Sequence, residues 1–116
     1  MTRTTAFGDD ALGDLDAVGV ADAIRSGAVS RVEVVDAAIA RTEKVNPALN
    51  GLAFDAFEAA RVRAGAPSPF GGYFDGVPTY VKDNVAVEGM PTMEGTSRIP
   101  STISITPIMR IQPLPR

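Results

Sequence analysis

A lysine stands in a short apolar, β-prone run, and it is the side chain of this sequence best suited to acid–base chemistry. The run reads Gly76-Val77-Pro78-Thr79-Tyr80-Val81-Lys82-Asp83-Asn84. Because a lysine buried without a partner is costly, either the run has an exposed face or Lys82 is buried for a chemical purpose. Spacing alone favours the first interpretation, an edge strand whose charge prevents aggregation. The second is a desolvated lysine that accepts a proton, with Asp83 and Asn84 holding its loop.

The composition narrows the chemistry that this chain can perform. It has no cysteine and no histidine, which excludes a disulfide framework, a cysteine nucleophile and a zinc site built from those residues. A Ser-His-Asp triad within the chain is excluded as well. Lys44 and Lys82 are the two lysines. Lys44 is expected to be solvated near the end of a helix, so Lys82 is the candidate base.

Length and charge indicate one globular domain that binds neither nucleic acid nor membrane. The chain has 116 residues, of which 45% are hydrophobic and 22% charged, with a net charge of -3. Such a composition is globular and gives no basic surface for nucleic acid. No apolar run approaches the length of a membrane span, and the first ten residues do not form a signal peptide. We therefore expect a cytoplasmic protein.

Two helices are predicted in the first half, after an N-terminal arm over residues 1–15. The first helix begins at Asp16 and stops at Gly27, a typical helix-ending residue. The second begins at Ser30, which forms a capping-box pattern with Glu33, and is expected to end at Asn46-Pro47. Its apolar stripe consists of Val32, Val35, Ala38, Ile39 and Thr42.

The second half alternates short elements with loops. We expect an extended segment over residues 50–54 and a small helix over residues 56–64, capped by Asp55 with Glu58. A Gly/Pro-rich linker over residues 65–72 follows, then a strand over residues 79–83 and a loop over residues 85–95.

The composition changes after Thr96. Residues 98–116 contain four prolines and no Ala, Asp or Glu. Residues 1–94 carry 8 basic and 14 acidic side chains, whereas residues 95–116 carry 3 basic and none acidic. This tail is expected to be a wrong-frame or truncated ending.

The run around Lys82 resembles the signature of a known enzyme family. With Gly89, Pro91-Thr92 and Gly95-Thr96 it is similar to the G-[VI]-P-x-x-[VI]-K-D-N run and the G-x-P-T-x-x-G-[ST] turn of the amidase signature family. Upstream, Ser26-Gly27-x-x-Ser30, the helix of residues 32–42 and Val45-Asn46-Pro47-x-Leu49-Asn50 resemble the family's opening. The resemblance covers residues 12–97, so residues 16–97 are expected to be the N-terminal part of an amidase domain.

The resemblance implies a fold and a mechanism. The fold is α/β: the N-terminal helices and first strand or strands of a large domain around a mixed sheet, here truncated. The enzyme hydrolyses linear amides with a Ser–cis-Ser–Lys triad and no cofactor, and its substrate is a small-molecule amide. Lys82 would be the base that acts through the cis-serine, and Asp83 and Asn84 would support its loop.

The sequence departs from the family where the serines should follow. Family members carry both serines in a Gly/Ser-rich segment downstream of the lysine, and none of the six serines here matches it: Ser26, Ser30, Ser68, Ser97, Ser101 and Ser104. The chain is therefore expected to be catalytically incomplete alone. The alternatives are a non-catalytic relic, a fragment complemented by a separate C-terminal polypeptide, and a piece like the A subunit of a glutamyl-tRNA amidotransferase.

Overall fold

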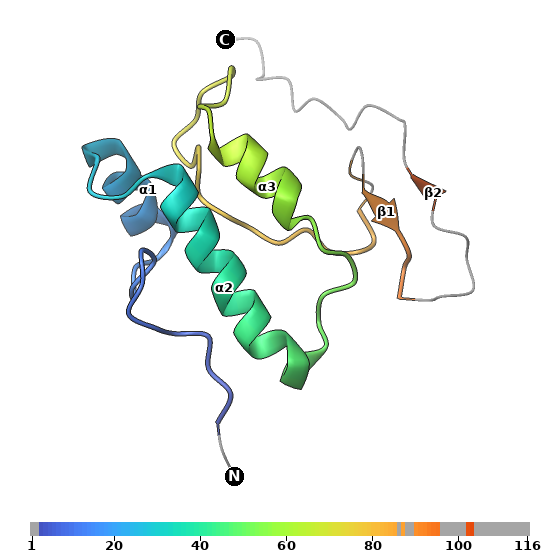
Figure 1. Cartoon of the computed structure of the whole chain (residues 1–116). Helices are drawn as coiled ribbons and strands as arrows, with labels where there is room; N and C mark the ends of the chain where they lie inside the picture. The colour runs from blue at the N-terminus through green and yellow to red at the C-terminus, as the bar shows by residue number, and fades with distance from the viewer. Residues whose placement is uncertain (1–2, 86, 88–89, 96–101, 104–116) are drawn as a thin grey trace. The chain divides into compact units, whose positions relative to one another are not determined.

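A computed structural model of the chain describes residues 3–85, 87, 90–95, 102 and 103. Along these residues run the helices α1 (Ala17–Ser26), α2 (Arg31–Leu49) and α3 (Phe57–Ala64), then the strands β1 (Pro91–Thr92) and β2 (Thr102–Ile103) (Figure 1). The chain divides into two compact units. The first consists of Met1–Leu52 with Ala56–Thr79 and contains the three helices; the second consists of Ala53–Asp55 with Tyr80–Arg116 and contains the two strands.

The starts of α1 and α2 follow the capping signals in the sequence. The Asp16 carboxylate accepts a hydrogen bond from the Gly19 N–H at 2.8 Å, and Gly27 ends α1 with a φ of 78°. At α2 the Ser30 hydroxyl accepts from the Glu33 N–H at 3.1 Å, while the Glu33 carboxylate accepts from the Ser30 N–H at 2.7 Å. The predicted capping box is confirmed, because each side chain satisfies a backbone donor that the first turn leaves open.

Helix α2 continues past Pro47, so the prediction that it ends at Asn46-Pro47 is wrong. Pro47 lies inside the last turn, where the missing N–H removes a single helical hydrogen bond. The Asn46 carbonyl accepts from the Asn50 N–H at 2.6 Å, and the Asn46 side chain accepts from the N–H groups of Gly51 and Leu52, each at 3.1 Å. These bonds hold the last turn, and Asn50 ends it with a φ of 47°, a conformation that asparagine tolerates.

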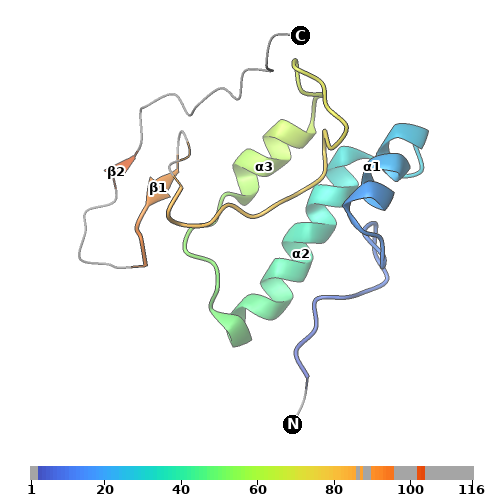
Figure 2. The ribbon, with the colours of Figure 1, turned by 180° about the vertical axis from the view of Figure 1, so that it is seen from behind.

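The contact between α2 and α3 forms the apolar core of the first unit. Val35 and Ile39 of α2 pack with Ala64, and Phe57 and Ala60 pack against this cluster. Both ribbon views show α3 alongside α2 (Figures 1 and 2).

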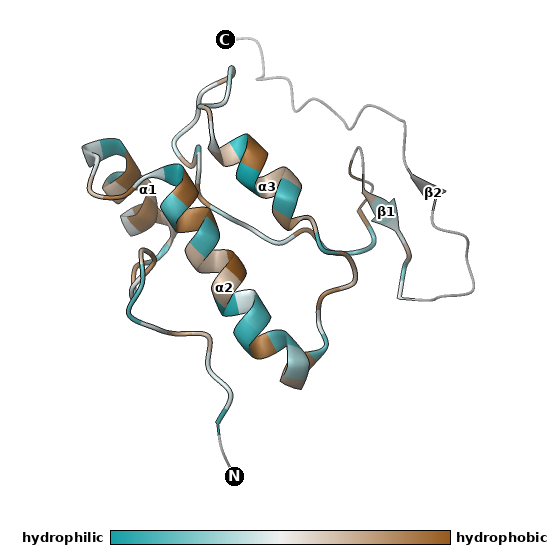
Figure 3. Cartoon of the chain, viewed as in Figure 1, coloured by the Kyte–Doolittle hydropathy of each residue, from teal (hydrophilic) through white to brown (hydrophobic). Residues whose placement is uncertain are grey.

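The predicted stripe of α2 is only partly right. Val34 and Ala37 are buried although they lie outside the stripe, while Val32 is 40% exposed. The hydropathy colouring shows apolar residues interspersed with polar ones along the visible side of α2 (Figure 3). Helix α2 therefore buries more of its circumference than a single stripe. For this reason, the apolar residues at helical spacing predict only part of the buried core.

Helix α3 begins one residue later than predicted. Its first residue is Phe57 and its N-cap position is held by Ala56, whose side chain makes no capping bond, so Asp55 lies one position before the N-cap instead of at it. The helix that was expected over residues 56–64 is otherwise present as Phe57–Ala64.

The sheet in the described residues is a single antiparallel pair. Pro91 lies opposite Ile103 and Thr92 opposite Thr102. No strand is assigned to residues 79–83, so the predicted strand is wrong for this structure. Residues 50–54, which were expected to be extended, form no strand either. A strand needs a neighbouring strand for its backbone hydrogen bonds, and the described strands β1 and β2 pair with each other. The described chain is helix-rich, and the mixed sheet of the predicted α/β fold stays a prediction. Of the predicted tail, only residues 102 and 103 are described.

Candidate active site

The segment that carries Lys82 leaves this side chain exposed at the start of a tight turn. The Lys82 carbonyl accepts a hydrogen bond from the Val85 N–H at 3.0 Å, and the residue is exposed. Among the described residues, none forms a hydrogen bond or ion pair with its ammonium group. The described part of the chain therefore does not supply the enclosure that a desolvated lysine needs, and the catalytic role of Lys82 remains a prediction.

Asp83 joins the lysine turn to the turn at residues 93–95. One carboxylate oxygen accepts from the Met93 N–H at 2.9 Å, and the other accepts from the Gly95 N–H at 3.1 Å. The Asp83 carbonyl accepts from the Glu94 N–H at 3.3 Å. Glu94 and Gly95 have φ angles of 51° and 74°, so this turn is left-handed at two successive residues. The two N–H donors lower the pKa of Asp83 below its ordinary value, because they stabilise the charged carboxylate.

Asn84, the other predicted supporting residue, is exposed. Its side chain forms no hydrogen bond with another residue of the described ranges. The structure therefore brings Asp83, but not Asn84, into contact with the turn at residues 93–95.

Sequence reasoning did not find the bonds between Asp83 and this turn. Met93 and Gly95 lie ten and twelve residues beyond Asp83. Capping and turn motifs join residues within about four positions, so they give no signal for such a pair. The available hint was Gly95, which the sequence places in the loop of residues 85–95 and in the glycine turn of the family motif.

The three described serines are engaged in local backbone structure. The Ser26 hydroxyl donates to the Ala23 carbonyl at 3.1 Å, Ser30 caps α2, and the Ser68 hydroxyl accepts from the Phe70 N–H at 3.3 Å. None of these three is arranged with a base as a nucleophile would be. The other three serines, Ser97, Ser101 and Ser104, lie outside the described residues.

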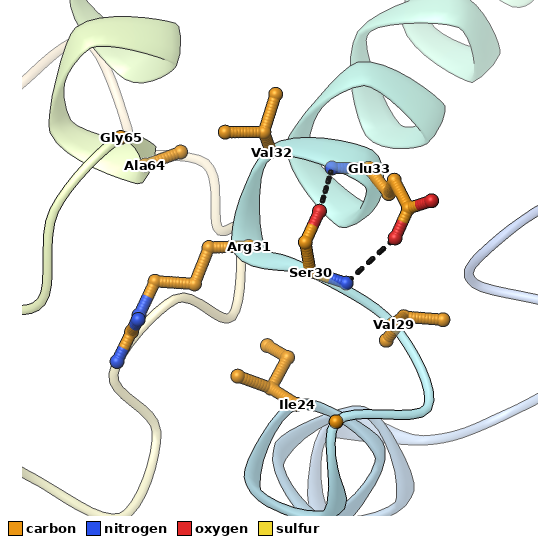
Figure 4. A pocket seen from close by; sticks show the side chains of 9 residues that line it. Ile24, Val29, Ser30, Arg31, Val32, Glu33, Ala64 and Gly65 are labelled. Carbon is orange, nitrogen blue, oxygen red and sulfur yellow. Dashed lines mark hydrogen bonds between the residues drawn. The ribbon is translucent and has the colours of Figure 1, made fainter.

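An open pocket lies where α1 passes into α2, next to the end of α3 (Figure 4). Its lining includes Ile24, Ser30, Arg31, Ala64 and Gly65, but neither Lys82 nor Asp83. Figure 4 shows the capping box of Ser30 and Glu33 at its rim, so those polar groups already have partners.

Two kinds of site find no support in the described part of the chain. No group of three or more acidic side chains there is arranged to hold a metal ion. None of the described helices has both the length and the apolar character needed to cross a membrane.

Several known proteins are similar to this chain. It is 62% identical over 96 residues to a Mycobacterium leprae protein named "Putative amidase AmiC", and the match covers 83% of this chain and 20% of the relative. It is 42% identical over 85 residues to an indoleacetamide hydrolase of Bradyrhizobium diazoefficiens, covering 68% of this chain and 16% of the relative. It is 40% identical over 94 residues to the fatty-acid amide hydrolase 2-B of Danio rerio, covering 70% of this chain and 18% of the relative.

The chain thus spans about a fifth of the length of the mycobacterial relative. No solved structure matches it significantly. The sequence model of the Amidase family matches residues 33–103, more than half of the chain, and this range includes the segment around Lys82. Together with the 62% identity, this match confirms the resemblance inferred from the sequence: the chain belongs to the amidase signature family.

Proposed function

We propose that this chain contributes the proton-transferring lysine, Lys82, to an amidase that hydrolyses linear amides to a carboxylic acid and ammonia or an amine. The observation that carries the proposal is the family match over residues 33–103, which includes the Gly76–Asn84 segment. The names of two relatives, an indoleacetamide hydrolase and a fatty-acid amide hydrolase, support the reaction class.

The proposed mechanism is a Ser–cis-Ser–Lys relay. A neutral Lys82 takes a proton from the cis-serine, which takes one from the nucleophilic serine as that oxygen attacks the amide carbon. The C–N bond breaks, the amine leaves with the relayed proton, and an acyl-enzyme remains. Water then attacks the ester carbonyl through the same relay, releasing the acid and restoring the serine. A serine hydroxyl is a weak nucleophile, so it depends on such an adjacent base.

None of the six serines of this sequence matches the Gly/Ser-rich segment in which the family carries both serines of this relay. Within the proposal, a complementing polypeptide supplies that segment and encloses Lys82. The same polypeptide would complete the mixed α/β sheet. The cytoplasmic location expected from the sequence remains a prediction within this proposal.

Complementation tests the proposal directly. The 116-residue chain is co-expressed with a polypeptide spanning the part of the Mycobacterium leprae relative that follows the matched region, and ammonia release from a simple primary amide is measured. We expect hydrolysis by the pair, and a loss of about a thousandfold or more with Lys82→Ala, since the residue is the only base of the relay. Lys44→Ala is the matched control and should leave the rate unchanged.

The chain alone should show no turnover above background. Hydrolysis by the chain alone that disappears with Lys82→Ala would contradict the need for a second polypeptide. Absence of hydrolysis from a pair that co-purifies would contradict the amidase proposal and favour a non-catalytic relic. Transfer of ammonia to a glutamyl-tRNA by the pair would instead favour the amidotransferase alternative.

A further inference from the structure

An ion pair connects the start of α2 to Asp75, the residue just before the lysine segment, Gly76–Asn84. The Arg31 Nη2 atom lies 2.8 Å from the Asp75 Oδ2 atom, and the two side chains are 29% and 20% exposed. Arg31 is the first residue of α2, and Asp75 immediately precedes Gly76. The pair therefore connects two segments 44 residues apart in sequence.

Asp75 also closes its own loop. Its Oδ1 and Oδ2 atoms each lie 3.2 Å from the Ser68 nitrogen, so the carboxylate accepts from that N–H as well as from Arg31. The Phe74 carbonyl accepts from the Val77 N–H at 3.0 Å, which forms a turn around Asp75 and Gly76. The Asp75 carboxylate thus joins Ser68 to Arg31, while a backbone bond closes the turn of residues 74–77.

Gly76 lets the arginine stem pass close to the backbone. A Cβ atom at this position would lie 2.5 Å from the Arg31 Cγ atom and 3.0 Å from its Cδ atom. Gly76 also has a φ of 91°, which other residues rarely adopt. The Arg31 Nε atom is buried and has no hydrogen-bond partner among the described residues. The guanidinium is therefore held by Asp75 and by packing, and only a glycine fits beneath it.

A second anchor holds the same segment on α1. The Tyr73 hydroxyl donates to the Asp22 carboxylate at 2.9 Å, and the Arg25 guanidinium lies 4.0 Å from the centre of the Tyr73 ring. The hydrogen bond to the Asp22 carboxylate raises the pKa of Tyr73 above its ordinary value, because it favours the protonated hydroxyl. Helices α1 and α2 thus each hold the segment that leads toward Lys82.

We propose that Arg31 is a positioning residue: through Asp75 and Gly76 it fixes the point from which the chain enters the lysine segment, six residues before Lys82. The claim that this placement serves catalysis by Lys82 rests on the proposed function. The clamp of Arg31, Asp75 and Gly76 can be tested without any amide hydrolysis.

Amide hydrogen exchange of the whole 116-residue chain, followed by NMR, tests the clamp. Arg31→Met keeps most of the stem and removes the charge. Protection of the Ser68 and Val77 amides should fall about tenfold, since loss of a charged hydrogen bond favours local opening by that order. Arg61→Met is the matched control: it removes the 2.9 Å pair with Asp36 and should leave both amides unchanged.

Conservative variants show whether the charge of Arg31 holds the loop or whether its substitution merely unfolds the surrounding structure. Arg31→Lys should recover part of the protection, because an ammonium group still attracts Asp75 although it lacks the guanidinium fork. About 1 M NaCl should narrow the difference between wild type and Arg31→Met, since salt screens a partly exposed pair. Asp75→Asn should lower Val77 protection in the same way as Arg31→Met.

Ser68 and Val77 protection within about twofold of wild type in Arg31→Met would overturn the proposal. So would equal losses in Arg31→Lys and Arg31→Met, or an equal loss at Val35 in the middle of the α2 core. Lys82→Ala should leave both amides unchanged, so a failed amidase assay and a failed clamp are distinguishable.

Discussion

At the scale of single residues, Asp83 does more for the lysine segment than its neighbours Lys82 and Asn84. Its carboxylate accepts from two backbone N–H groups, at Met93 and Gly95, and both lie outside any regular helix or strand. Backbone donors aimed at one carboxylate favour its charged form, which is why the pKa of Asp83 is lowered. The link between the two turns therefore depends on a charge and not only on shape.

This dependence gives a pH prediction. A lowered pKa in the folded chain means that the link is fully formed above the ordinary carboxyl pKa of 3.8 and is lost as pH falls through the lowered value. The Met93 and Gly95 amide resonances should thus shift together, with a midpoint below 3.8, in an NMR titration. In Asp83→Asn both amides should lose this titration, because the side-chain amide keeps one acceptor and no charge. Exposed Asp9→Asn is the control, and a titration that survives in Asp83→Asn would contradict the assignment.

At the scale of elements, α2 binds the N-terminal arm through Arg41. The Arg41 Nε atom donates to Asp10 at 2.7 Å, and its Nη2 atom donates to Asp10 and to the Gly13 carbonyl, each at 2.6 Å. Asp10 in turn accepts from the N–H groups of Leu12 and Gly13. These bonds, led by the one from Arg41, lower the pKa of Asp10 from 3.8 to about 2.

Acid should therefore release the arm. The stabilisation is complete above pH 3.8, and it decreases as pH falls toward about 2 and Asp10 becomes protonated. The pair is partly exposed, so solvent limits its contribution to about 1 kcal/mol or less. The Leu12 amide and the ring of Phe7, which lies 5.8 Å from the Arg41 guanidinium, should report this transition in NMR spectra.

Asp10→Asn should remove the acid transition and release the arm at neutral pH. Asp36→Asn, which removes an ion pair between α2 and α3, should leave the arm signals as in wild type. An arm transition that persists in Asp10→Asn would show that another group controls the docking.

At the scale of the whole molecule, buried apolar surface is scarce. Among the described residues the buried apolar ones all lie in the first unit: Val20, Ala21, Val34, Val35, Ala37, Ile39 and Ala64. Large apolar side chains are exposed in both units: Val62 and Phe70 of the first unit are 71% and 81% exposed, and Tyr80 of the second is 72% exposed. Because burial of apolar surface is the main favourable term in folding, the described chain has little to support one cooperative transition.

The isolated chain should accordingly unfold over a broad temperature range. A cooperative domain of this size absorbs about 80 kcal/mol at its midpoint, at about 0.7 kcal/mol per residue. We expect calorimetry to record well under half of that heat, and circular dichroism to show a gradual loss of helix. Binding of a dye specific for exposed apolar surface is expected at room temperature. A sharp transition with the full enthalpy would refute this expectation.

The sequence by itself determined the family, the capped helices and the segment that carries Lys82. These features rest on local signals. Ser30 and Glu33 form their capping box three residues apart, and Gly27 ends α1 through its own backbone conformation. The family motif is likewise a run of neighbouring residues, so a single chain is enough to identify it.

Only the tertiary structure decided which distant groups meet. Arg31 pairs with Asp75 across 44 residues, and Asp83 holds Met93 and Gly95. It also decided that α2 runs through Pro47 and that residues 79–83 form no strand. The physical reason is the same in each case. Ion pairs and strand pairing depend on where the chain returns in space, and local propensity does not encode that path.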